Sequence, residues 1–183
     1  DVAFANDYPH LPKHLKSPWS SNPTVERFAN ARALLKLFDR RSFHPNRVAE
    51  TGIVPRLFVD RVPHDMHRLT VDEKTSLFIR ILLPAVIKVN ELVLTVRKRL
   101  HDLHDKQSRG SELSVAEKAW LKEIADDYKI AANPEVIETL LKRVDIVPVA
   151  MALAQGSDES GWGTSRLAKQ ANAFFGEHGP API

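Results

Sequence analysis

The stretch Val147–Gly163, VPVAMALAQGSDESGWG, decides the fold and carries the chemistry. Its first half is an unbroken run of apolar residues at helical spacing, which is typical of a helix buried on nearly all sides. An acid pair, Asp158–Glu159, then stands in the last turn of that helix. The two glycines around Trp162 allow the chain to bend sharply beside an aromatic wall. The sequence therefore predicts a core helix that ends at an acid pair and a tight turn.

The acid pair has two interpretations. Burial against Trp162 and the negative end of the helix dipole would both favour a carboxylic acid that keeps its proton. A protonated carboxyl in a cleft is what hydrolysis of a glycosidic bond needs. Two solvated acids at a helix end, beside an ordinary core tryptophan, fit the same residues. The residues alone choose neither between these interpretations nor between Asp158 and Glu159.

Composition restricts the class of protein. The chain has 183 residues, of which 43% are hydrophobic and 27% charged, so we expect one globular domain or one domain with a helical extension. It has no cysteine, which excludes disulfides and thiol chemistry. The net charge of +3 suits an anionic polymer such as cell wall, but the basic residues are interspersed with acids, so we expect no nucleic-acid partner. The apolar run Ile81–Ile87 is too short for a transmembrane segment.

The rest of the chain predicts a mainly α fold. Residues 1–22 lack a hydrophobic period and are expected to form an extended arm. Two capping boxes, at Thr70–Glu73 and Ser114–Glu117, predict helix starts, and Pro84 predicts a kink or break. Residues 53–59 are expected to form a short strand or a packed turn. Helices are predicted over residues 23–41, 70–106, 114–129, 133–143, 147–160 and 164–172.

The motif E-S-G-W-G-T-S-R, Glu159–Arg166, resembles the signature of the β-N-acetylglucosaminidase domain of peptidoglycan hydrolases, glycoside hydrolase family 73 of the lysozyme-like superfamily. In that family the motif follows a helix with A-Q, here Ala154–Gln155, and precedes an N-x-F-G element, here Asn172–Gly176. Bacterial Bax-type members are especially similar, through upstream segments such as Leu77–Pro84 and Arg143–Pro148. The resemblance covers most of residues 54–176.

The resemblance implies site residues and a substrate. Glu159 would be the general acid that protonates the leaving sugar oxygen at the β-1,4 bond between N-acetylglucosamine and N-acetylmuramic acid. Substrate-binding roles would fall to Trp162, Ser160, Asn172 and Phe175. The implied partner is the peptidoglycan glycan strand, in the periplasm or elsewhere in the exported bacterial cell envelope. No cofactor is implied, and the sequence identifies no protein partner.

The family pattern also sets the expected domains. We expect an extended arm at 1–22, a helical accessory region at 23–132 and the N-terminal part of a lysozyme-like glucosaminidase domain at 133–183. Family members continue past N-x-F-G to a second carboxylate and much of the sugar groove, whereas after the motif this chain carries only Glu177 as an acid before Ile183. The alternative hypothesis is therefore a non-catalytic module that binds peptidoglycan or regulates a hydrolase.

Other candidate sites are weaker. His101–His104 and His64–His67 have a spacing that can bind a metal, but neither has a third ligand in its pattern, so we expect no metal. Ser160 and Ser165 lack the G-x-S-x-G context of a nucleophile. Glu91 is expected to be a paired structural acid, and Arg97–Arg99 a solvated helix face with peptidoglycan or membrane-surface contact as the alternative.

Overall fold

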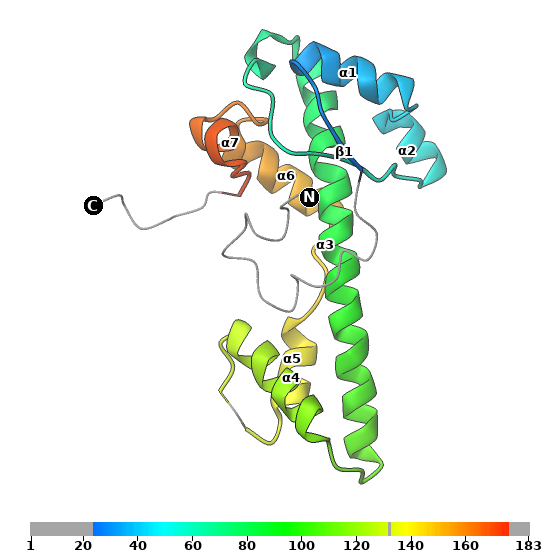
Figure 1. Cartoon of the computed structure of the whole chain (residues 1–183), viewed down its shortest axis with the longest axis vertical. Helices are drawn as coiled ribbons and strands as arrows, with labels where there is room; N and C mark the ends of the chain where they lie inside the picture. The colour runs from blue at the N-terminus through cyan, green and yellow to red at the C-terminus, as the bar shows by residue number, and fades with distance from the viewer. Residues whose placement is uncertain (1–23, 132, 176–183) are drawn as a thin grey trace, which may run out of the picture. The chain divides into compact units, whose positions relative to one another are not determined.

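The computed structural model describes residues 24–131 and 133–175, and this part of the chain is mainly helical, as predicted (Figure 1). The arm predicted at 1–22 and the helix start predicted at Asn22–Pro23 lie outside the described residues. In chain order the elements are β1 Thr24–Glu26, α1 Ala31–Arg40, α2 Pro45–Thr51, β2 Leu57–Val59, the 3-10 helix η2 Met66–Arg68, α3 Val71–Ser108, α4 Val115–Asp127, α5 Val136–Arg143, α6 Val149–Ser160 and α7 Arg166–Ala171.

Contacts between Cα atoms divide the chain into two compact units. The first, called the motif unit here, comprises residues 23–87 together with 147–183; the second unit includes residues 88–146. The long helix α3 contributes to both units and runs without interruption in Figure 1. The motif unit thus combines segments from both sides of residue 133. The accessory and glucosaminidase domain boundaries predicted from the sequence stay a prediction.

The motif unit is built on one apolar core. Side chains of α1, the first half of α3 and α6 share a cluster whose fully buried members include Leu34, Phe38, Leu77 and Phe78. β1 and β2 pair in parallel, with Val25 opposite Phe58, so residues 53–59 contain the predicted short strand. Together these elements fix the start of α3 beside α1 and α6.

A buried arginine adds a polar contact to that core. The Arg80 side chain is only 4% exposed, and its Nη1 donates to Asp39 Oδ1 at 2.6 Å and to the Phe43 carbonyl at 3.1 Å. A buried guanidinium requires such partners, because an unpaired buried charge is strongly destabilising. Arg80 therefore ties α3 to the end of α1 and the chain that follows it.

The second unit packs the later part of α3 with α4 and α5 around Leu100, Ile124, Leu140 and Val144. Arg97 Nη1 donates to the carbonyls of Leu141 and Val144 at 2.6 and 2.7 Å, which satisfies groups at the end of α5. The Arg99 guanidinium lies 4.1 Å from the centre of the Trp120 ring. The prediction that Arg97–Arg99 is a solvated face is therefore wrong for Arg97, whereas Lys98 and Arg99 are exposed as predicted.

Several predicted helix starts are also wrong. Residues predicted to begin the first helix form β1, and α1 begins at Ala31, where Asn30 Oδ1 accepts from the Ala33 N–H at 2.9 Å. α7 is capped by Ser165 and begins at Arg166, two residues after the predicted start at 164. Cap residues recur along this chain, and tertiary packing decides which of them is used.

Two other local predictions differ from the structure. α2, Pro45–Thr51, was not predicted, although proline at its first position and left-handed Gly52 at its end are typical helix signals. α3 continues through Pro84, so the alternative of a break is wrong. Pro84 is buried, and core packing on both sides of it holds the helix despite the lost N–H.

The capping box at Ser114–Glu117 predicts an acid-sensitive contribution to stability. The Lys106 ammonium, then the Ser114 N–H and hydroxyl, lower the Glu117 pKa from 4.5 to about 2. The folded pKa is the depressed one, so this stabilisation is complete above pH 4.5 and disappears as the pH falls towards 2. We expect Glu117→Gln to lower the thermal midpoint at pH 7, and the difference from wild type to shrink on acidification.

The matched control is Glu123→Gln, an exposed acid on the same helix α4. Thermal melts of the three proteins between pH 2 and 7 make the comparison. A deficit of Glu117→Gln that stays constant across this range would contradict the assigned role.

Candidate active site around Glu159

Helix α6 is buried on one side only, so the prediction of a helix buried on nearly all sides is wrong. Positions four residues apart on a helix share a stripe. Ala152, Gly156 and Ser160 form the buried stripe, which faces the core. Two stripes are exposed, and their members are Ala150, Ala154 and Asp158 on one and Met151, Gln155 and Glu159 on the other. Met151 alone is 60% exposed.

The acid pair therefore lies in solvent. Asp158 and Glu159 occupy different exposed stripes in the last turn of α6, and neither is buried against Trp162. Of the two interpretations that the sequence left open, burial against Trp162 is wrong for both carboxylates, and solvated acids at a helix end are confirmed. The apolar residues that suggested burial belong partly to exposed stripes. What the structure does provide is a Glu159 side chain accessible to a large ligand.

A tight turn follows Glu159 directly. Gly161, Trp162 and Gly163 have φ angles of 56°, 57° and 76°, so three successive residues are left-handed. Such a conformation is strained for tryptophan and needs fixed partners. The Trp162 N–H donates to the Ser157 carbonyl at 2.9 Å, which closes the helix end.

Ser160 stabilises this turn through hydrogen bonds made by its buried side chain. Its side chain is fully buried; the hydroxyl donates to the Gly156 carbonyl at 2.5 Å and accepts from the Gly163 N–H at 2.9 Å. The Ser160 carbonyl accepts from the Ser165 N–H at 2.9 Å, where α7 is capped. The residue next to Glu159 thus connects α6, the turn and α7.

Aromatic rings form the base of the turn. The buried Phe78 ring of α3 makes edge contacts with Trp162 at 5.4 Å and with Phe174 at 5.8 Å between centroids. Trp162 itself remains 37% exposed. One part of its ring therefore packs in the core, and the rest contributes to the surface of the motif unit.

The loop of residues 60–66, which precedes α3, supports the same turn. A Cβ atom at Gly163 would lie 3.4 Å from Met66 Sδ, 3.5 Å from a Val62 methyl and 3.6 Å from the Phe78 ring. Asn172, the left-handed cap of α7, binds the loop through its side-chain amide. Sequence reasoning missed this loop, since nothing local in residues 60–66 indicates contact with a motif 100 positions away.

The remaining predicted ligand, Phe175, is 44% exposed, and its ring lies 3.4 Å from the position of a Cβ at Gly156. The structure thus places Glu159, Ser160, Trp162, Asn172 and Phe175 in one unit. Two of the five, Ser160 and Asn172, use their side chains to bind protein backbone. Glu159, Trp162 and Phe175 have accessible side chains.

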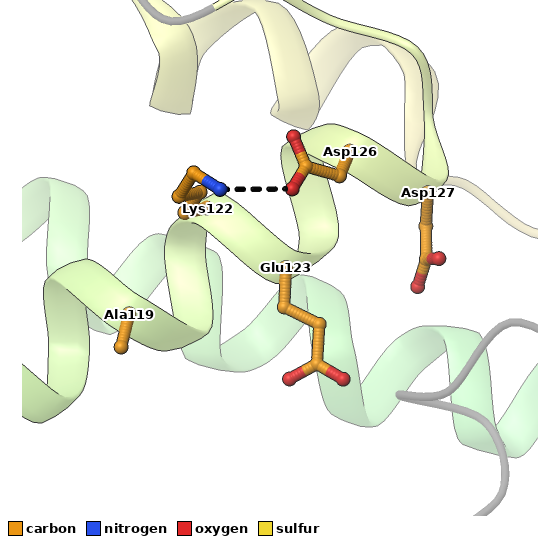
Figure 2. A pocket seen from close by; sticks show the side chains of 5 residues that line it. All are labelled: Ala119, Lys122, Glu123, Asp126 and Asp127. Atoms are coloured by element: carbon orange, nitrogen blue, oxygen red, sulfur yellow. Dashed lines mark hydrogen bonds and ion pairs between the residues drawn. The ribbon is translucent and has the colours of Figure 1, made fainter.

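A pocket of about 300 Å³ lies elsewhere, on α4 in the second unit (Figure 2). Its lining is Ala119, Lys122, Glu123, Asp126 and Asp127, and Lys122 Nζ pairs with Asp126 Oδ2 at 3.4 Å. These are charges on a solvated helix face and indicate no ligand. In residues 24–131 and 133–175, no group of three or more His, Asp or Glu side chains could hold a metal ion.

Gly163→Ala is expected to destabilise the motif unit. A residue other than glycine at a φ of 76° costs about 1–2 kcal/mol, and the added methyl would stand in close van der Waals contact with Met66, Val62 and Phe78, so the turn has little room to relax. Gly110→Ala is the matched control, with a φ of 75° but no atom within 4 Å of its Cβ position. Urea unfolding should show the larger loss for Gly163→Ala. Equal losses would contradict the expectation that the packed surroundings of Gly163 add to the backbone strain.

Comparison with known proteins gives two matches. Residues 134–181 match the family model Glucosaminidase, described as mannosyl-glycoprotein endo-beta-N-acetylglucosaminidase. A search of curated proteins finds Protein bax of Escherichia coli (strain K12), 41% identical over 103 residues, which covers 54% of this chain and 36% of that protein. The chain therefore spans about a third of its relative's length. No solved structure matches it. Together the two matches confirm, over the matched part of the chain, the resemblance to Bax-type members of the glucosaminidase family.

Proposed function

We propose that this chain is part of a peptidoglycan hydrolase that cleaves the β-1,4 bond between N-acetylglucosamine and N-acetylmuramic acid, with Glu159 as the general acid. The observation that carries the proposal is the position of Glu159. It lies exposed on the last turn of α6, directly before a turn with three left-handed residues, inside the segment that matches the glucosaminidase family.

The surface beside Glu159 suits a sugar chain. Glu159, Gln155 and Met151 form one exposed stripe of α6, so an acid, an amide and an apolar side chain lie in a row. The amide can hydrogen-bond sugar hydroxyls, and the apolar group can pack on a ring face. The exposed parts of Trp162 and Phe175 supply further apolar surface in the same unit.

Each motif residue then has a role in the proposal. Glu159 protonates the glycosidic oxygen as the bond to the leaving sugar breaks. Trp162 and Phe175 contribute wall to the binding surface. Ser160 is a positioning residue, because its buried hydroxyl is used by the Gly156 carbonyl and the Gly163 N–H. Asp158 occupies a different stripe of α6 and takes no chemical step.

The proposed substrate implies a location. Peptidoglycan lies in the bacterial cell envelope, so we propose that this protein is exported, with glycan strands as its partner. The net charge of +3 is compatible with an anionic polymer. Within residues 24–131 and 133–175, no helix is both long enough and apolar enough to cross a membrane.

The direct test is incubation of the purified protein with a suspension of purified peptidoglycan, followed by turbidity. Hydrolysis should clear the suspension, and heat-unfolded protein should leave it turbid. A suspension that stays turbid with folded protein would overturn the enzymatic proposal for this chain. Sedimentation of the same mixture then tests the alternative hypothesis, because a non-catalytic binding module would pellet with the intact polymer.

A further inference from the structure

We propose that Asn172 is a positioning residue that holds the turn after Glu159 through the loop of residues 60–66. This loop, and not only the segment that matches the family, would then be an integral part of the glucosaminidase unit. The expected effect of Asn172 on catalysis rests on the proposed function. Its effect on the turn rests on contacts that can be measured without any activity.

The Asn172 side chain binds the loop at two points. Its Oδ1 accepts from the Val62 N–H at 2.9 Å, and its Nδ2 donates to the Asp60 carbonyl at 3.0 Å. The amide therefore bridges two backbone groups that flank Arg61. Aspartate would lack the donor and alanine would lack both groups. Asparagine also tolerates the left-handed conformation found here, with a φ of 52°.

The same loop touches the turn. Val62 and Met66 are each only 1% exposed, and each has an atom within 3.5 Å of the position that a Cβ atom of Gly163 would occupy. Gly163 stands just before the start of α7, and Asn172 caps the end of that helix. Residues 60–66 therefore lie beside the turn that precedes α7 and bind the residue that caps its end, although the Val62–Asn172 pair is separated by 110 positions in the sequence.

A chain of contacts leads from this clamp to the proposed acid. Asn172 fixes Val62, Val62 packs on Gly163, and the Gly163 N–H donates to Ser160 Oγ, one residue after Glu159. Loss of the Asn172 amide leaves the Val62 N–H and the Asp60 carbonyl without this partner. The loop would then move from the turn, and the turn would no longer hold the end of α6 in one place.

The competing role for Asn172 is that of a substrate ligand, which the family resemblance implies. The two roles predict different measurements. A ligand contributes only when the glycan is bound, so its loss would raise KM and leave the free protein unchanged. A positioning residue acts in the free protein, so its loss would change the turn itself and lower kcat.

The experiment uses Trp162 as a reporter. In a Trp19→Phe, Trp120→Phe background Trp162 is the sole tryptophan, and its emission and acrylamide quenching report on the turn. Asn172→Gly removes the amide but keeps the freedom to adopt a positive φ. Asn172→Asp keeps the acceptor for the Val62 N–H. The matched control is Lys129→Gly, which changes another left-handed residue, with a φ of 53°, in the second unit.

Asn172→Gly should make Trp162 more accessible to acrylamide and speed amide hydrogen exchange at Val62 and Gly163. It should also lower kcat on peptidoglycan about 100-fold with KM little changed, because a displacement near 1 Å has that effect on a reacting group. Asn172→Asp should alter quenching, amide exchange and kcat in the same direction as Asn172→Gly, but by smaller amounts. Lys129→Gly should match the parent background in every readout.

Quenching and exchange in Asn172→Gly that equal those of Lys129→Gly would overturn the proposal, as would a rise in KM alone. If circular dichroism shows that Asn172→Gly is unfolded, Asn172→Asp takes its place in the test. Acrylamide quenching of Trp162 and amide exchange at Val62 that equal those of the parent background would then overturn the proposal. An inactive parent with altered Trp162 quenching in Asn172→Gly would refute the proposed function and support the positioning role. An active parent background with unaltered Trp162 quenching in Asn172→Gly would support the proposed function and refute the positioning role.

Discussion

Glu159→Gln is expected to lower the rate of peptidoglycan hydrolysis by about 10²–10⁴-fold, the contribution of a positioned general acid. Glutamine keeps the length and shape of the side chain but has no carboxylic proton to transfer to the glycosidic oxygen. Because Glu159 is exposed, the substitution disturbs no buried contact. The rate should therefore fall with little change in the thermal midpoint. Release of soluble glycan from purified peptidoglycan gives the rate.

Asp158→Asn is the matched control for this experiment. It removes a neighbouring exposed carboxylate, by the same change of charge, from another stripe of α6. We expect Asp158→Asn to retain most of the wild-type rate. Equal rates for wild type and Glu159→Gln would remove Glu159 from the acid role, and a selective loss in Asp158→Asn would transfer that role to Asp158.

Phe78→Ala is expected to destabilise the motif unit by about 3–5 kcal/mol, the usual cost of truncating a buried phenylalanine. Phe78 is 1% exposed and lies at the centre of the site's packing. Its ring contacts Trp162 and Phe174 edge-on and lies below Gly163. The cavity would therefore open directly beneath the turn that follows Glu159. The loss can be measured from the midpoint of urea unfolding.

Phe175→Ala provides the comparison, because that ring is 44% exposed and its removal leaves less of a cavity. We expect its unfolding midpoint to lie much closer to wild type than that of Phe78→Ala. If the two truncations cost the same, the assignment of Phe78 to the core and Phe175 to the surface is contradicted.

Local signals predicted some helix boundaries and missed others. The capping boxes at Thr70–Glu73 and Ser114–Glu117 are both present, because each needs only residues within one helical turn. The helix-end glycine Gly161 is left-handed for the same local reason. The start of α1 could not be placed in this way, since Asn22 and Asn30 are both good caps and the β1–β2 pairing decides between them.

The sidedness of α6 was beyond sequence reasoning. Val147–Ala154 is apolar on every side, so its hydrophobic pattern does not specify which stripe faces the core. Only the tertiary packing brings Gly156 against Leu82 and leaves Met151 exposed. For this reason the sequence left both burial and solvent exposure of the acid pair open, and the structure shows that both acids are exposed. The motif itself was found by resemblance, and the physical pattern alone did not choose Glu159 over Asp158.

The contacts that hold the turn after Glu159 could not be predicted from the sequence either. Asn172 was predicted as a substrate ligand, but its amide binds the Asp60–Val62 backbone. A side-chain contact to backbone leaves no mark in the sequence of the partner, because any residue except proline offers an N–H and a carbonyl. A single sequence therefore cannot reveal a clamp of this kind.

The central claim concerns which bond is cut, and the new reducing ends test it most directly. Purified peptidoglycan digested with this protein can be reduced with borohydride, hydrolysed and analysed for amino-sugar alcohols. A β-N-acetylglucosaminidase breaks the bond at C1 of N-acetylglucosamine and leaves that sugar as the new reducing end. The account therefore predicts glucosaminitol in the wild-type digest and a strongly reduced amount with Glu159→Gln. Muramitol as the new end, or no new ends with folded wild-type protein, would contradict the account.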